Sequence, residues 1–477
     1  MIILVYTKYC KDTIQDNIGE SEYSYYYVLQ RFLPILKEVG KVVELRDPVK
    51  EVDDLYAKAK FNGESCVFLC FSAPHNQFLD LLCPSIAVFA WEYDSIPNEY
   101  WGEDPRSNWV EVLKKMGSAI THSEHSVAVV KKELGNSYPI ISCPAPIYKF
   151  TEKCKKQSDS NHQFTLDTTK EHIDSKTIDF QKESPSISLN KRFEVTHLLL
   201  QRWSHEVVED ILPRYFYRFL RNTYLLAGTS IARSVRFFTG KQNLASKSLN
   251  ITPNKEKELI TGIIYTSILN VFDSRKNVHD MLSAFVSALG DKEDATLIVK
   301  TPITGGDYFF REMILGYLRK LPPFRCRILV LAYYLEKGDY SKLIDSTSFY
   351  VNTSYGEGQC LPLMEYLSSG IPAIAPKATA LEDYINEENS FVLSTAASPT
   401  YWQHDERKAI RTVHHRPDWY AIVEAFKESY KVTKEDQIRY RRMSENALQS
   451  MKSHAEASLI RDRLKRFLKQ QMTESTN

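Results

Sequence analysis

The 477-residue sequence contains no window of about 18 uninterrupted apolar residues, so it predicts no transmembrane helix. Its first residues, MIILVYTKYCKD, lack the basic segment of a signal peptide and predict a β-strand instead. Lys and Arg (61) nearly balance Asp and Glu (60), so no strong positive field indicates a nucleic-acid-binding protein. We therefore expect a cytoplasmic protein that binds no nucleic acid. Peripheral attachment to the inner face of a membrane is the alternative location.

Paired cysteine motifs are also absent. The eight cysteines form no Cys-x-x-Cys pair, and several lie in strand-like apolar runs such as CVFLCF at 66–71. This placement favours buried free thiols in a reducing compartment over disulfides or metal ligands. Apolar residues make up 43% of the chain and charged residues 25%, which is ordinary for a folded protein.

What the sequence does contain is an alternation of short apolar runs with helix-like stretches, in two blocks. Continuous apolar strands that alternate with helices are typical of parallel sheets covered on both faces. The length also exceeds that of a single ordinary core. The sequence therefore predicts an α/β protein with two doubly wound, Rossmann-like domains that face each other across a cleft. The predicted strands are 2–6, 66–71, 85–92, 119–123 and 139–146 in the first block, and 260–269, 295–301, 326–334, 348–354 and 372–376 in the second.

The region between the blocks has a different composition. Residues 151–192 are polar and predict a disordered loop. Residues 212–241 carry six basic residues and no acidic one, interleaved with Tyr, Phe and Leu, and predict a helical insert. This insert either lies on an anionic membrane surface or packs on the protein with its arginines in solvent. The predicted units are 1–150 and 258–420 for the two domains, 151–257 for the insert, and 421–477 for helices that pack back toward the N-terminal domain.

The segment NTSYGEGQCLPLMEYLSSGIPAIAP at 352–376 carries the clearest chemical signal. A strand, a glycine-flanked turn and a helix follow one another, so helix N-terminal amides should face the crevice at the carboxyl ends of the strands. Such amides attract phosphate, and Gly356 and Gly358 would let a ligand approach the backbone closely. The two oxygens of Glu365 suit the adjacent hydroxyls of a ribose, while Glu357 would face a neighbouring polyhydroxyl group.

A phosphate ligand also needs a cation, and the same domain offers one. Arg275 and Lys276 lie at or before the start of a helix predicted over 277–289. Basic residues at that end oppose the helix dipole, and a bound pyrophosphate would offset the cost. A solvated basic turn is the alternative interpretation of this dipeptide.

Together these residues resemble the Glu-x7-Glu signature of retaining glycosyltransferases with the GT-B fold, most like glycosyltransferase family 4. The resemblance covers most of 260–395 and is thinner over 85–147. It implies that a hexose is transferred from a nucleotide-diphosphate donor to a glycan, lipid-linked or polysaccharide acceptor, with retention and without a cofactor or metal. No Asp-x-Asp motif supports the metal-dependent alternative fold. Two other functions stay open: a nucleotide-sugar epimerase of the same fold, and an inactive membrane-associated scaffold.

The resemblance also implies roles for single residues. The donor ribose would contact Glu365, the transferred sugar would lie beside Glu357, and the phosphates would bind Lys276. Glu357 and Lys276 are the predicted catalytic residues. The remaining predicted donor-site residues are Gly19, Asn270, Arg275, Gly358, Gln359, Cys360 and Leu361.

Two positions depart from the pattern of this family. Asn270 stands where many members carry an arginine, so Arg275 would supply part of that charge. Ala378, Thr379 and Ala380 stand where members often have a Gly-Gly pair, which affects how the sugar is seated.

On the N-terminal side, three residues near predicted strand ends are candidates for acceptor contacts. His122 and His125 lie three positions apart in THSEHS, and Glu92 follows another strand. For the histidines, ordinary packing or capping is the alternative, and a metal site would need a further ligand that we do not find. Glu92 is equally explained as a structural residue.

Overall fold

The computed structural model describes residues 1–14, 17, 19–20, 22–102, 104–147, 163–178, 257–302 and 308–474. The N-terminal part forms a six-stranded sheet in the order β2-β1-β3-β4-β5-β6, and all of its strand pairs are parallel. The central strand β3, CVFLCF, is buried at every position, as its unbroken apolar run predicts. The strands are β1 Ile2–Thr7, β2 Lys41–Glu44, β3 Cys66–Phe71, β4 Ser85–Phe89, β5 Ala119–Thr121 and β6 Ile140–Ser142.

Helices connect these strands, and their ends follow simple capping rules. The Asn108 side chain accepts hydrogen bonds from two amides at the start of α3, and Gly117 ends that helix in the left-handed region. Ser123 caps α4 in the same way. The elements are α1 Tyr23–Val39, α2 Pro48–Phe61, η2 Pro74–Asn76, η3 Pro105–Ser107, α3 Trp109–Met116 and α4 Glu124–Leu134.

The C-terminal part forms a seven-stranded sheet in the order β15-β14-β13-β10-β11-β12-β8. All its pairs are parallel except the last, in which β8 lies antiparallel to β12. The strands are β8 His172–Asp174, β10 Ile263–Ile268, β11 Ala295–Lys300, β12 Arg327–Leu331, β13 Phe349–Val351, β14 Ala373–Pro376 and β15 Ser390–Leu393. The helical segments between them are η6 Ser274–Lys276, α8 Val278–Leu289, α9 Tyr308–Leu318, α10 Lys337–Ser346, α11 Leu361–Ser368 and η7 Thr379–Asp383.

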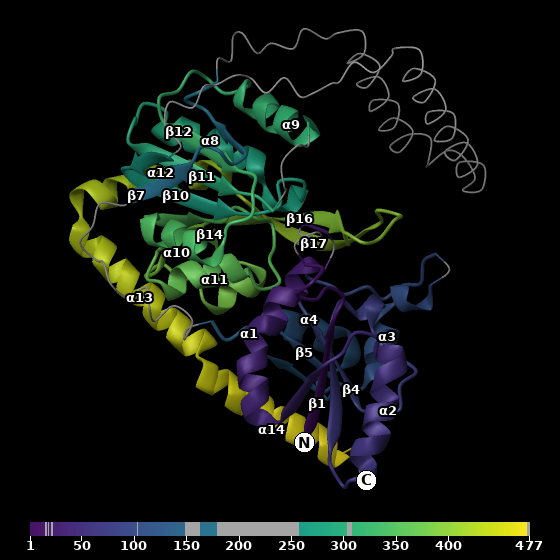
Figure 1. Ribbon diagram of the computed structural model, residues 1–477. Coiled ribbons are helices and arrows are strands. Elements are labelled where there is room, and N and C mark those ends of the chain that lie inside the picture. The colour runs from purple at the N-terminus through teal and green to yellow at the C-terminus, as the bar shows by residue number, and fades with distance from the viewer. Residues whose placement is uncertain are drawn as a thin grey trace, which may run out of the picture. The chain divides into compact units, whose positions relative to one another are not determined.

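Two further strand pairs and three helices complete the described chain (Figure 1). Helix α14 packs against α1, where Arg461 Nη1 donates to Glu38 Oε2 over 2.8 Å. The described residues of Met1–Lys176 and Glu256–Asn477 form one compact unit. The elements are β7 Gln163–Asp167, β9 Lys257–Thr261, β16 Thr395–Tyr401, β17 Ile410–Pro417, α12 Trp419–Glu435, α13 Gln437–Ala455 and α14 Ala457–Glu474.

The predicted α/β architecture with two doubly wound sheets is confirmed, but three details of the prediction were wrong. The strand predicted at 260–269 is two strands, because Gly262 turns the chain at φ +104° and a Cβ there would meet the Asp294 carbonyl at 2.2 Å. The loop predicted over 151–192 contains β7 and β8, whose few apolar residues alternate and are buried. The strand β2 and helix α2 were not predicted. The segment 212–241 lies outside the described residues.

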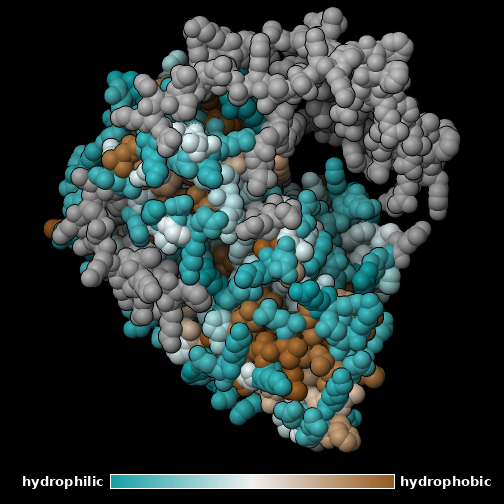
Figure 2. All heavy atoms as spheres, viewed as in Figure 1, coloured by the Kyte–Doolittle hydropathy of each residue, from teal (hydrophilic) through white to brown (hydrophobic). Residues whose placement is uncertain are grey.

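On the face shown in Figure 2, the described surface is mostly hydrophilic, and a hydrophobic area lies over the N-terminal half. None of the helices in the described part of the chain is both long and apolar enough to cross a bilayer. The seven cysteines in these residues are all free thiols, and five of them are buried.

Candidate functional site

Two neighbouring strand ends of the C-terminal sheet carry the predicted chemistry. The segment η6, which contains Arg275 and Lys276, follows β10, and the loop that leads into α11 follows β13. Because β10 and β13 pair in parallel, both loops leave the same edge of the sheet. The Tyr355 amide also donates to the Arg275 carbonyl over 2.8 Å, so the loops contact each other. The fold thus brings two motifs that are distant in sequence to one place.

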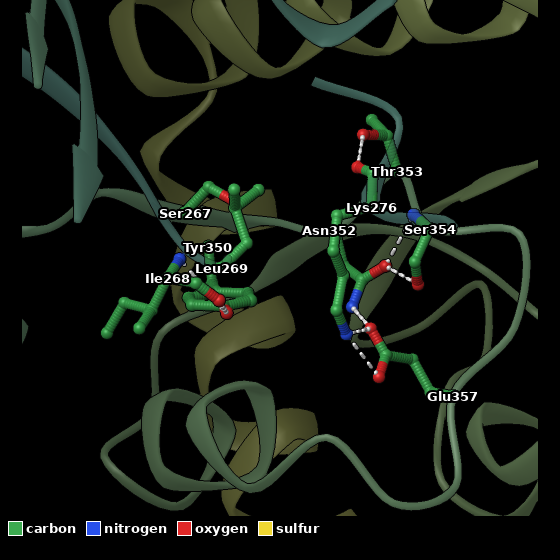
Figure 3. A pocket seen from close by; sticks show the side chains of 9 residues that line it. All are labelled: Ser267, Ile268, Leu269, Lys276, Tyr350, Asn352, Thr353, Ser354 and Glu357. Carbon is green, nitrogen blue, oxygen red and sulfur yellow. Dashed lines mark hydrogen bonds and ion pairs between the residues drawn. The ribbon is translucent and has the colours of Figure 1, made fainter. Parts of the chain in front are cut away.

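Lys276 and Glu357 form the centre of this site. Lys276 Nζ lies 2.7 Å from Glu357 Oε1 and 2.8 Å from Oε2, so the ammonium group binds both carboxylate oxygens. Asn352 Nδ2 donates a further hydrogen bond to Oε1 over 3.1 Å. Figure 3 shows the Lys276, Asn352 and Glu357 side chains converging. The cavity beside them measures about 10 Å³, room for about one water molecule.

Both members of this pair stay charged at neutral pH. Burial alone would raise the pKa of Glu357, but Lys276 and Arg275 outweigh burial and hold this pKa at about 2. Burial acts to lower the pKa of Lys276, but the charge of Glu357 outweighs burial. The pKa of Lys276 is therefore raised. Only 18% of the Lys276 side chain and 6% of the Glu357 side chain are exposed. Removal of either charge would leave the other poorly hydrated and unpaired.

Arg275 lies beside this pair but is occupied by other protein groups. Its Nη1 donates to the Gly356 carbonyl over 2.5 Å, and its Nη2 donates to Asp273 Oδ2 over 3.0 Å. Its Nε lies 3.5 Å from Glu92 Oε1, so an acceptor-side candidate meets the donor-side loop. Burial raises the pKa of Glu92, although Arg275 acts to lower it. Arg275 thus braces the loop, and its contact with phosphate stays a prediction.

The two loop glycines allow a close approach of protein backbone. A Cβ at Gly356 would lie 2.6 Å from the Glu92 carbonyl oxygen, and a Cβ at Gly358 would lie 2.8 Å from the Ala90 Cβ. Real Cβ atoms do not tolerate such contacts, so glycine is needed where the loop meets the segment after β4. The sequence predicts the approach of a ligand at these positions, and that role stays a prediction.

Gln359, Cys360 and Leu361 connect this loop to α11. Gln359 is buried, and its Oε1 accepts a hydrogen bond from the Ala145 amide over 2.6 Å. Cys360 precedes the helix with φ 61°, a left-handed conformation that is uncommon outside glycine, and Leu361 is the first helical residue. Burial raises the pKa of the Cys360 thiol to about 12, so this thiol stays protonated.

Thr379 stands where the resembled family often has a Gly-Gly pair, and its backbone has a conformation that is usual for glycine. Its φ is 54°, so it adopts the left-handed backbone for which glycine is the usual residue. Its hydroxyl accepts a hydrogen bond from the Glu357 amide over 3.0 Å and lies 3.1 Å from the Glu357 carbonyl, to which it donates. A strained backbone conformation of this kind persists only where the surroundings fix it. Here two hydrogen bonds join the Thr379 hydroxyl to the backbone of Glu357.

Glu365 is the fifth residue of α11 and is buried. Arg31 Nη2 of α1 donates to its Oε1, and the Tyr340 hydroxyl of α10 donates to its Oε2 over 2.5 Å. Both carboxylate oxygens are therefore fixed in direction by protein donors. Contact with a ribose stays a prediction.

Asn270 and Gly19, two predicted donor-site residues from different halves, lie together. Asn270 Nδ2 donates to the Gly19 carbonyl over 3.4 Å. Gly19 has φ +96°, and a Cβ there would lie 3.8 Å from a Pro302 side-chain carbon. The loop after β1 thus reaches the carboxyl edge of the C-terminal sheet.

The two candidate histidines are held by backbone carbonyls. His122 is 1% exposed, its Nδ1 lies 2.8 Å from the Cys143 carbonyl oxygen, and burial lowers its pKa to about 4. His125 Nε2 lies 3.2 Å from the Tyr93 carbonyl oxygen. These contacts are those of packing residues, so an acceptor role for either histidine stays a prediction. Within the described ranges, no group of three or more His, Cys, Asp or Glu side chains could hold a metal ion.

The structure adds residues that sequence reasoning missed. Arg31, Tyr340 and Asn352 hold the two glutamates, and none of them belongs to the motif. One signal was present for Arg31: it is a single charge among the apolar residues of YVLQRFLPIL. Asn352 opens the segment 352–376 but was not assigned a role, and for Tyr340 the sequence offers no comparable signal.

Comparison with known proteins gives no family. No protein-family model matches the chain, and no curated protein matches it. Among solved structures, the chain is similar to HepE from Anabaena in complex with UDP and glucose, at 11% identity over 98% of this chain and 100% of that chain, with a TM-score of 0.46.

Two further solved structures are similar over almost the whole chain. Sucrose-phosphate synthase from Thermosynechococcus elongatus shows 11% identity over 99% of this chain and 100% of that chain, with a TM-score of 0.49. A glycosyltransferase from Rickettsia africae shows 9% identity over 99% and 98%, with a TM-score of 0.49.

Proposed function

We propose that the chain is a retaining glycosyltransferase of the GT-B type, most like family 4, that takes a hexose from a nucleotide-diphosphate donor. The acceptor would be a glycan, a lipid-linked sugar or a polysaccharide. One observation carries this proposal: the buried Lys276–Glu357 pair lies where two parallel strands end and α11 begins. This place in an open α/β sheet is the usual binding crevice.

A donor diphosphate would take over part of the Lys276 ammonium. The cavity beside the pair measures about 10 Å³, room for about one water molecule, so a phosphate oxygen that reaches Lys276 would compete with Glu357 for the ammonium group. A diphosphate offers Lys276 several anionic oxygens, and the amides at the start of α11 supply further donors. Arg275 adds positive charge beside them, since its Nη1 lies 3.9 Å from Glu357 Oε2.

Released from Lys276, Glu357 would face the sugar. Its low pKa keeps it anionic, so it accepts hydrogen bonds from sugar hydroxyls and stabilises positive charge that develops at the anomeric carbon. In the transfer, the bond between the anomeric carbon and the phosphate oxygen breaks, and its electrons go to the diphosphate. The acceptor hydroxyl adds to the same face, and its proton goes to the departing phosphate. Lys276 stabilises the leaving diphosphate, and no step needs a metal.

Glu365 would bind the donor ribose at the other end of the nucleotide. Two adjacent hydroxyls suit a carboxylate whose two oxygens are fixed in direction.

The peripheral membrane contact proposed for 212–241 is tested separately, by liposome flotation of a variant with Arg214, Arg218 and Arg221 changed to Glu. Unchanged partition would remove that part of the proposal.

Calorimetric titration with UDP, GDP, ADP and dTDP tests the donor site directly. We expect one of them to bind the wild-type protein and Glu365→Ala to lose at least about tenfold in affinity, since hydrogen bonds to a charged group are lost. The matched control is Glu424→Ala, which removes an exposed glutamate of α12. If none of the four binds, the inactive scaffold becomes the better account. Once a donor is known, the anomeric configuration of the product tests retention.

A further inference from the structure

We infer that Arg31 is a positioning residue for the donor ribose: it holds Glu365 so that the N-terminal half takes part in nucleotide recognition. This inference rests on the proposed function and deepens it. Arg31 belongs to α1, and Glu365 belongs to α11 of the other half. Figure 1 shows α1 beside the part of the C-terminal half that contains α11.

The contacts of Glu365 define what a ligand could still reach. Oε1 accepts from Arg31 Nη2, and Oε2 accepts from the Tyr340 hydroxyl. A carboxylate has about four lone-pair sites, so two protein donors leave about two sites free. Two free sites on adjacent oxygens match the two neighbouring hydroxyls of a ribose. Arg31 and Tyr340 thus set the direction of the acceptor sites without filling them.

Because the Glu365 carboxylate is buried, it needs a positively charged partner. The Glu365 side chain is 10% exposed and that of Arg31 26%. A carboxylate so far from water is costly unless it is paired and hydrogen-bonded. Tyr340 supplies a neutral donor only, so the positive charge at Glu365 comes from Arg31. Without Arg31, Glu365 would turn toward water, and this change would spoil a site that accepts two hydroxyl protons.

The face of α1 that carries Arg31 lies along the candidate site. Tyr23, Tyr27 and Arg31 are spaced by four residues, so they lie on one face of the helix. Burial raises the pKa of Tyr23, which also feels the charges of Lys276 and Glu357. One helix face therefore extends from the proposed phosphate site to the proposed ribose site. This arrangement makes Arg31 part of the nucleotide site, whereas a chance surface bridge would stand apart from it.

The alternative is that Arg31 merely joins the two halves. Another arginine provides the matched control for this idea. Arg407 follows β16 in the C-terminal half, and its Nη1 donates to Glu99 of the N-terminal half over 3.0 Å. Its side chain is 23% exposed, close to the 26% of Arg31. If the loss of any arginine contact between the two halves weakens nucleotide binding, Arg407→Met should weaken it as well.

The experiment compares a nucleoside diphosphate with its 2′,3′-dideoxy counterpart, using whichever of UDP, GDP or ADP binds the wild-type protein. Because hydrogen bonds to a charged group are strong, we expect the wild-type protein to prefer the ribose form by at least about 30-fold. In Arg31→Met this preference should fall below about fivefold, while affinity for the dideoxy form changes by less than about twofold. Arg31→Lys, which keeps the charge but not the planar fork, should be intermediate. Arg407→Met should keep the wild-type preference.

Three results would overturn the inference. The first is a wild-type preference retained in Arg31→Met, and the second is an equal loss for both nucleotides, which indicates a bridging role. In these two cases the proposed function still stands, because the wild-type protein binds the ribose form. If no nucleoside diphosphate binds the wild-type protein, the proposed function fails and this inference fails with it. Should Arg31→Met not fold, the same comparison in Arg31→Lys and Tyr340→Phe decides the question.

Discussion

The two sheets of this protein share an architecture, but their carboxyl edges use polar residues in opposite ways. In the N-terminal half, His122 and His125 lie against backbone carbonyls. In the C-terminal half, Lys276 and Glu357 are paired with each other across two loops. A side chain held by the backbone has little freedom to exchange partners, whereas an ion pair can exchange one anion for another. The location of a strand end is therefore a weaker guide to function than the partner of the residue found there.

The largest expected effect is the loss of the Lys276 charge. Lys276→Met should weaken nucleoside diphosphate binding or turnover by up to about 1,000-fold, about 4 kcal/mol, by analogy with the removal of a transition-state donor. The pKa of Glu357 should also rise from about 2, because its main counter-charge is gone. Titration calorimetry and a turnover assay measure the first effect. Lys292→Met, which removes an exposed lysine paired with Asp291, is the control. Unchanged binding in Lys276→Met would show that the ion pair does not distinguish the carboxyl edge of the C-terminal sheet as a binding site.

A second prediction concerns the outer strand of the C-terminal sheet. Arg327 binds Asp174 of β8, which is 2% exposed, so Arg327→Met should lower the free energy of unfolding by about 3 kcal/mol. Arg325→Met removes an exposed pair with Glu293 and should cost less than about 1 kcal/mol. Chemical denaturation measures both values. Arg327→Met combined with Asp174→Leu should recover much of the loss, because no unpaired charge remains buried.

A third prediction tests the contact between the loop that contains Gly356 and Gly358 and the N-terminal half. Gly358→Ala would place a Cβ 2.8 Å from the Ala90 Cβ and 3.0 Å from the Trp91 amide nitrogen, and we expect a loss of about 2 kcal/mol from overpacking. Gly338→Ala in α10 meets nothing within 4 Å and should be neutral or stabilise by up to about 1 kcal/mol. Thermal and chemical unfolding compare the two. Equal stability of both variants would show that the loop does not depend on the close approach.

The smallest expected effect concerns pH. His404, after β16, stacks on Trp109 and His75 with centroid distances of 4.9 and 4.8 Å. Burial lowers its pKa to about 4, and His75 acts in the same direction while Asp405 opposes it. The unfolded chain, with a pKa of about 6.5, binds the proton more readily, so stability is lost as pH falls from about 6.5 toward 4.

Between pH 7 and pH 5 this histidine should account for a loss of about 1–2 kcal/mol. His404→Phe keeps the stacked ring and should reduce the loss by that amount, as measured by denaturation at the two pH values. The same acid sensitivity in wild type and variant would mean that another group titrates.

The sequence predicted the parts of the fold that depend on local pattern. The strands over 66–71 and 295–301 were identifiable because they are buried on both faces and so are continuously apolar. The strand β2 is half exposed at its apolar positions and sits at the sheet edge, so KVVE gave no clear signal. A single glycine, Gly262, decided whether one strand or two would form, and a periodic pattern does not report such a contact.

The candidate site likewise contains contacts that the sequence predicted and contacts that it did not. The pairing of Lys276 with Glu357 joins residues 81 positions apart, yet both were singled out because each follows a predicted strand in the same sheet. Arg31 is 334 positions from Glu365 and lies in the other half. Contact across the two halves depends on how they pack together, and no spacing rule along the chain reports that.

Arg327 has a consequence for how this protein could change in evolution. It binds Asp174 and Glu258, and β7 pairs with β9, so the described residues that flank the 179–256 segment lie close together. The entropy of closing a loop rises only slowly with its length, so the chain between such fixed points can grow or shrink at little cost to the sheet. The described fold therefore contains an insertion point. At this position a lineage could acquire, exchange or lose a whole module while the sheet edge that carries Lys276 and Glu357 stays intact.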